Sequence, residues 1–130
     1  MNYIIVTNNN KVFNFYKETD EVIFLENIIF QEVLRSVEKN IKDGHKLLSD
    51  PILYNLENSS NPFKSILISK NRYLDNNTSL ELIEGAVHIS QKLSPKDKEL
   101  LSHDSLEEYR FVDLNLIIDS IKQLNTNKIV

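Results

Sequence analysis

Cysteine is absent from the 130 residues, and glycine is nearly absent. Without cysteine the chain has no disulfide, no thiolate nucleophile and no thiolate ligand for zinc or an iron–sulfur cluster. Its two glycines, Gly44 and Gly85, stand far apart. The sequence therefore contains neither the dinucleotide-binding loop nor the phosphate-binding P-loop, because each motif needs closely spaced glycines. These absences exclude several classes of enzyme and select none.

Long apolar runs and an excess of positive charge are also missing. No run approaches the roughly 18 to 20 residues of a membrane span, and residues 1–7 lack the basic, apolar and small-residue pattern of a signal peptide. We therefore expect a soluble, cytoplasmic protein without a membrane partner. The chain carries 15 Lys and Arg against 19 Asp and Glu, and its cations are dispersed. Phosphate contacts need clustered cations, so we expect no nucleic-acid binding.

What is present is the composition of a folded globular protein, with 41% hydrophobic and 26% charged residues. The length is typical of one domain, which we expect to span 1–130. Short runs rich in β-branched residues predict strands over 3–7, 21–26 and 64–69, and more weakly over 46–49. Both faces of these runs are apolar, as in strands covered by helices on both sides.

Helical spacing of apolar residues predicts the elements between and after the strands. We expect helices over 12–16, about 30–41, from a capping box at Thr78–Glu81, at Ser94–Asp97 and from near Ser105. Asn27 is a candidate N-cap for the second of these, and Gly44 stands where a left-handed residue would end it. The order predicts an α/β fold, a small single-domain sandwich with a mostly parallel sheet of three or four strands flanked by helices.

Residues able to carry chemistry gather in two segments, 44–51 and 61–65, which bracket one loop. In open α/β sheets ligands bind beyond the carboxyl ends of strands. The candidate ligand-binding residues are Thr7, Asn8, His45, Lys46, Ser49, Asp50, Lys64 and Ser65. We expect five of these to converge under the loop from Pro51 to Pro62, namely His45, Lys46, Ser49, Lys64 and Ser65. Two ammonium groups and two hydroxyls would there bind a phosphate or carboxylate. Ordinary turn chemistry explains the same residue types and stays open as an alternative.

Catalytic and metal sites are weakly supported by the sequence. His45, His88 and His103 are widely spaced and none has a metal-motif neighbour at helical spacing. We therefore assign no catalytic residue, no metal ligand and no cofactor.

The chain resembles the GrdX family in four stretches: Ile4–Asn9, Gly44–Leu48 ending at Pro51, Pro62–Ser69 and Ser79–Glu84. This family comprises small proteins encoded beside glycine reductase components in amino-acid-fermenting anaerobic bacteria. The resemblance covers most of residues 3–93 and implies a role in that fermentation, with glycine reductase components as partners. It assigns no catalytic role to these motifs. Because glycine reduction is selenol and thiol chemistry, a chain without cysteine is expected to assist or regulate the enzyme instead of taking part in the redox steps.

Two hypotheses about function follow. In the first, the chain is an accessory protein that binds an enzyme component or a small anionic metabolite. In the second, it is a small hydrolase or transferase that works through His45, Lys46, Ser49 and Asp50. A pocket that holds His45 within hydrogen-bonding distance of Ser49 or Asp50 would favour the second hypothesis, and an exposed apolar patch on the last helix would favour the first.

Overall fold

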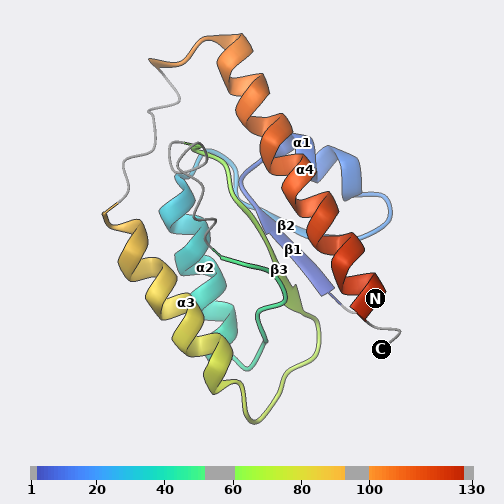
Figure 1. The fold of residues 1–130 in the computed structure, drawn as a ribbon, viewed down its shortest axis with the longest axis vertical. Coiled ribbons are helices and arrows are strands. Elements are labelled where there is room, and N and C mark those ends of the chain that lie inside the picture. Colours follow the sequence, from blue (N-terminus) through green and yellow to red (C-terminus); the bar gives the residue numbers. More distant parts are fainter. Residues whose placement is uncertain (1–2, 52–60, 93–99, 128–130) are drawn as a thin grey trace.

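The computed structural model describes residues 3–51, 61–92 and 100–127. Their elements follow the order β1 (Tyr3–Thr7), α1 (Asn10–Tyr16), β2 (Glu21–Phe24), α2 (Phe30–Lys42), β3 (Ser65–Ser69), α3 (Asn77–Ser90) and α4 (His103–Asn127). Helices and strands thus mix along the chain as the apolar patterns predicted, and the fold is a small α/β sandwich (Figure 1).

The sheet has three strands in the order β2-β1-β3. The central strand β1 pairs in parallel with β2 and antiparallel with β3. In the antiparallel pair Ile5 lies opposite Leu67, and Thr7 lies opposite Ser65. Side chains alternate between the two faces of a strand, so Ile5, Thr7, Ser65 and Leu67 all point to one face of the sheet.

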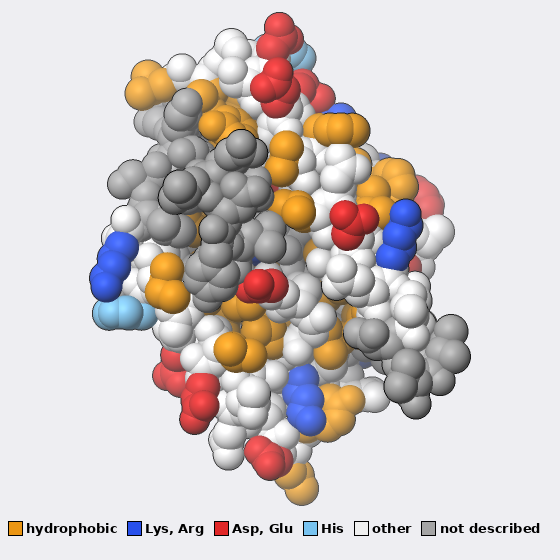
Figure 2. All heavy atoms as spheres, in the orientation of Figure 1, with side chains coloured by type: hydrophobic (Ala, Val, Ile, Leu, Met, Phe, Trp, Pro, Cys, Tyr) orange, Lys and Arg blue, Asp and Glu red, His pale blue; other side chains and the backbone are white. Residues whose placement is uncertain are grey.

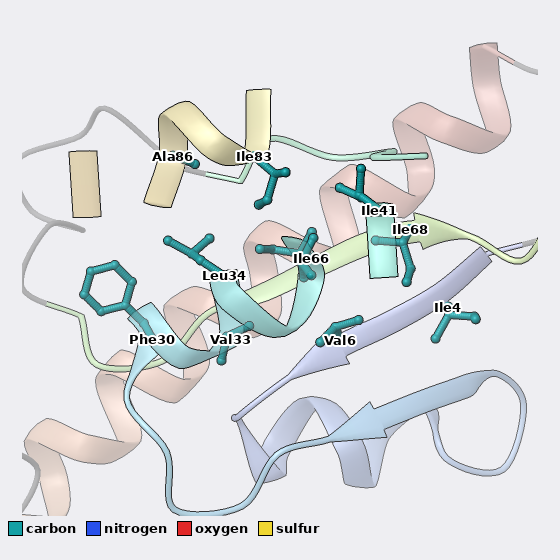
Figure 3. Close-up of a cluster of buried hydrophobic side chains, with 11 residues drawn as sticks. Ile4, Val6, Phe30, Val33, Leu34, Ile41, Ile66, Ile68, Ile83 and Ala86 are labelled. Atoms are coloured by element: carbon teal, nitrogen blue, oxygen red, sulfur yellow. The ribbon is translucent and has the colours of Figure 1, made fainter. Parts of the chain in front are cut away.

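Helices cover both faces, with α2 and α3 on one side and α1 and α4 on the other (Figure 1). On the first side, Ile4 and Val6 of β1 and Ile66 and Ile68 of β3 meet the buried stripe of α2, which in turn packs against α3 (Figure 3). On the second side, Tyr3, Ile5 and Leu67 meet Val12 of α1 and Leu114, Ile117 and Ile121 of α4. Both faces of β1 and β3 are therefore buried, which explains why their sequences do not alternate, whereas β2 is only partly buried.

The expectation of a mostly parallel sheet is only partly right, because one of the two strand pairs is antiparallel. After α2, Gly44 (φ 112°) turns the chain back, as the sequence predicted. Residues 46–49 then run antiparallel along the outer edge of β3, with hydrogen bonds between Ser69 N and Lys46 O and between Leu48 N and Leu67 O. Leu47 forms one isolated bridge with Ile68, so this segment is a short edge pairing and the sheet keeps three strands.

Two predicted helix caps are wrong. Asn27 lies in a turn with φ 60°, and Ile29 occupies the N-cap of α2. Helix α3 begins at Asn77, which places Thr78 within its first turn. Before α3, a run of polar residues over 75–79 offers several equivalent caps, and Asn76 occupies the N-cap. The helix predicted at Ser94–Asp97 and most of the Asn-rich loop lie outside the described residues.

Within the described ranges, no helix combines the length and apolar content required to cross a membrane. The face of the molecule in Figure 2 shows Lys and Arg side chains interspersed with Asp and Glu, in line with the dispersed charges of the sequence.

Candidate functional site

Where β1 ends and β3 begins, a polar cluster replaces the apolar packing between the sheet and α4. Thr7 and Ser65 are opposite each other on neighbouring strands, and their hydroxyl oxygens are 2.6 Å apart. Ser65 donates its hydroxyl to Oδ2 of Asp113 on α4 at 2.7 Å. A hydroxyl carries one proton, so Thr7 must be the donor in its bond with Ser65. The backbone N–H of Asn9 completes the chain by donating to Thr7 Oγ1 at 3.0 Å.

Asp113 is the centre of this cluster and is buried. Its Oδ2 also accepts a hydrogen bond from Asn9 Nδ2 at 3.0 Å. Burial raises the pKa of the Asp113 carboxyl group, while the bonds from Asn9 and Ser65 and the positive charge of Lys64 act in the opposite direction. The hydrogen-bond donors hold the Asp113 carboxyl group in a fixed position. Because the group is buried, a charged group that binds beside it changes its ionisation.

Three asparagine side chains form hydrogen bonds with the backbone around the cluster. Asn8 donates to the carbonyls of Ile28 and Pro62 and accepts from Lys64 N. Asn9 caps α1 by accepting from Lys11 N, and Asn61 links Phe63 N to the carbonyl of Tyr109. The amide groups of Asn8 and Asn9 are thus committed to the protein, so these residues position the site and their side chains do not serve a ligand.

A small pocket opens beside Asp113. Its lining residues come from the 46–49 edge segment and the residue after it, from the start of β3 and from α4: Ser49, Asp50, Lys64, Ser65, Asp113, Leu116, Ile117 and Ser120. The pocket volume is about 50 Å³, whereas a cavity needs roughly 10 to 15 Å³ to hold one water. It can therefore hold about three to five non-hydrogen atoms.

Lys64 is half-buried as a residue and lines this pocket. In the described part of the chain, the ion pairs join other side chains and none includes Lys64. Burial lowers the pKa of Lys64, and the charges of Asp113 and Asp50 oppose that shift. A partly desolvated cation without a direct ion pair gains strongly from an anionic group placed beside it.

The structure brings together Ser49, Asp50, Lys64 and Ser65, with Thr7 and Asn8 behind them. The two ends of the loop are neighbours, as the sequence argument required. Of these residues, Ser49 also accepts a hydrogen bond from Leu67 N, which fixes its hydroxyl at the edge of β3.

The expected convergence of His45 and Lys46 on the same site is wrong. His45 Nδ1 lies 2.6 Å from Ser69 O, and Lys46 N donates to Ser69 Oγ. Because 46–49 runs antiparallel to β3, Lys46 lies beside Ser69, about 16 Å from Lys64 at roughly 3.3 Å a residue. The Lys46 ammonium instead lies over the Tyr73 ring, 4.3 Å from its centroid. The group of His45, Ser49 and Asp50 that the hydrolase hypothesis requires is not assembled.

Sequence reasoning missed Asp113, although a signal was present. The spacing of Tyr109, Asp113 and Ile117 places a carboxyl group on the apolar stripe of the last helix, where a charged residue is costly unless it has partners. Over the described residues, no group of three or more His, Asp and Glu side chains is arranged to hold a metal ion.

A family model described as GrdX, GrdX-like protein, matches residues 4–122 of the chain. No curated protein and no solved structure matches it. The matched range includes the cluster around Asp113, the pocket and every element of the sheet.

Proposed function

Because the chain belongs to the GrdX-like protein family, we propose that it is an accessory protein that assists or regulates glycine reductase by binding, with the anionic group of a small metabolite held at Lys64. The family description supports the association with glycine reductase. The pocket supports binding as the mode of action, as does Lys64, which forms no ion pair with another described residue.

The observation that carries this proposal is the environment of Lys64. Lys64 is half-buried, lines a pocket and forms no ion pair within the described ranges. Ser49 adds a hydroxyl donor at the same pocket, whereas the Ser65 proton is committed to Asp113. A carboxylate or phosphate oxygen would restore the solvation that Lys64 has lost, and the Ser49 hydroxyl would orient it.

Thermal unfolding with added acetate, inorganic phosphate and acetyl phosphate tests the proposal. Binding to the native state alone stabilises by RT ln(1 + [L]/Kd), which is about 1.4 kcal/mol at ten times Kd. We expect at least one of these anions to raise the melting temperature of the unmodified protein, and Lys64→Met to abolish the rise. Lys46→Met is the matched control, since it removes the same charge at the other end of β3. A melting temperature indifferent to all three anions, or a rise that Lys64→Met preserves, would reject the proposal.

A specific observation also favours contact with an enzyme component. Helix α4 exposes the large apolar side chain of Phe111 (58%) next to Val112 (38%). Exposed neighbouring apolar residues are common at protein interfaces. Affinity purification from a glycine-fermenting host should recover glycine reductase components, and Phe111→Ser should reduce their recovery. Recovery of the same components by both proteins would exclude Phe111 from the contact.

A further inference from the structure

Charges of both signs line the pocket that the proposed function assigns to an anion. Lys64 supplies a positive charge, and Asp50 and Asp113 supply carboxyl groups. A simple anion would satisfy Lys64 but would bring a third negative group toward two carboxyls. A doubly charged phosphate would suffer most from that repulsion, because like charges in a partly buried site interact strongly.

A ligand with one charge of each sign avoids this cost. Its carboxylate can pair with Lys64 while its ammonium group faces Asp113 or Asp50. The Asp113 carboxyl group is held in place by Ser65 and Asn9, so it is a preorganised acceptor for a cationic donor. Leu116 and Ile117 add apolar side chains to the lining of the pocket and reduce competition from water.

The size of the pocket further limits the class of ligand that it can hold. A volume of about 50 Å³ leaves space for about three to five non-hydrogen atoms. Among zwitterions, the upper end of this range is the size of the smallest α-amino acid, in which one carbon separates the ammonium group from the carboxylate.

Resting on the proposed function, we propose that the pocket between Lys64 and Asp113 is a binding site for a small zwitterion of the α-amino acid class. The carboxylate lies against Lys64 and the hydroxyl of Ser49, whose oxygen accepts from Leu67 N and whose proton is therefore free to be donated. The ammonium group lies against Asp113, with Asp50 at the mouth of the pocket adding negative charge. No bond is made or broken, and the bound amino acid is the signal or the cargo.

Calorimetric titration of the full chain with glycine, acetate and methylammonium tests the idea. Glycine has both charged groups, and each of the other probes has one of them. We expect glycine to bind at least about tenfold more tightly than acetate or methylammonium, since a second charge-assisted hydrogen bond in a partly buried site is worth that much or more.

Three variants separate the roles of the charges. Asp113→Asn should weaken glycine binding about tenfold and leave acetate binding unchanged or stronger. Asp50→Asn should do the same to a smaller degree, and it provides a second test if Asp113→Asn fails to fold. Lys64→Met should remove binding of both glycine and acetate, while Lys46→Met should change neither.

The outcomes distinguish this inference from the proposed function. If acetate binds as tightly as glycine and Lys64→Met removes the binding of both, the pocket binds anions and the inference of a zwitterion site is wrong. If no probe binds, or if Lys64→Met changes nothing, both proposals fail. A glycine preference that survives both Asp113→Asn and Asp50→Asn would also reject the inference, because the ammonium group would then have another partner.

Discussion

Replacing Ser65 with alanine should destabilise the protein strongly, because it breaks the polar cluster at its middle. The Ser65 hydroxyl donates to the buried Asp113 carboxyl group and accepts from Thr7. A hydrogen bond to a charged group contributes about 1.5 to 3 kcal/mol and a neutral one about 0.5 to 1.5 kcal/mol. The two bonds together predict a loss of about 2 to 4 kcal/mol in the free energy of unfolding.

Urea denaturation followed by circular dichroism measures this loss, with Ser36→Ala as the matched control. Ser36 lies on α2, and no side-chain hydrogen bond of Ser36 occurs among the described residues. Its replacement should change the free energy of unfolding by less than about 0.5 kcal/mol. Thermal melting should show a drop on the order of 10 °C for Ser65→Ala. If Ser65→Ala unfolds at the same urea concentration as Ser36→Ala, the hydrogen-bonded chain from Thr7 to Asp113 contributes nothing and the reasoning is wrong.

Other predictions test the core, the turn and the buried charge. Leu67→Ala should lower the free energy of unfolding in urea by about 2 to 5 kcal/mol, because it removes three fully buried carbon atoms and leaves a cavity. The same change at the exposed Leu74 should lower it by almost nothing. Equal urea midpoints for the two variants would place Leu67 outside the core. Gly44→Ala should destabilise the protein, because φ is 112° and a Cβ would lie 3.2 Å from that of Arg72. Gly85→Ala, in open space on α3, should stabilise the protein by about 0.5 to 1 kcal/mol. A higher melting temperature for Gly44→Ala would contradict the left-handed turn at Gly44. Burial raises the pKa of Asp113 above its unfolded value, so between the two values the native state binds more protons and stability falls as pH rises. Relative to Asp113→Asn, the unmodified protein should therefore lose stability as the pH is raised from about 4, and urea midpoints that change in parallel for both proteins would refute this.

The secondary structure was largely predictable because local patterns determine it. Short β-branched runs marked all three strands, and helical spacing marked α2 and α4. Gly44 was recognised as the end of α2 because few other residues adopt a positive φ at low cost. Helix caps were less predictable, since α2 begins after Ile29 without a side-chain cap and Asn27 lies in the preceding turn.

The direction of β3 could not be read from the sequence, and the composition of the site depends on it. An antiparallel β3 places Ser65 opposite Thr7 and sends Lys46 to the far end of the strand. If β3 ran parallel to β1, the same residues would lie beside different neighbours. Strand direction is decided by how the whole chain packs, and no run of five residues contains that information. Lys64 and Ser65 were found from their type and position, but their partner Asp113 arrives from a helix 48 residues later.

Nuclear magnetic resonance titration of the ¹⁵N-labelled protein with glycine tests the central claim most directly. The amide signals of Lys64, Ser65 and Asp113 surround the pocket, and those of His45 and Lys46 lie at the other end of β3. The account predicts saturable changes of chemical shift at the first three residues and none at the last two. Signals that do not move, or saturable changes confined to His45 and Lys46, would contradict a binding site at Lys64 and Asp113.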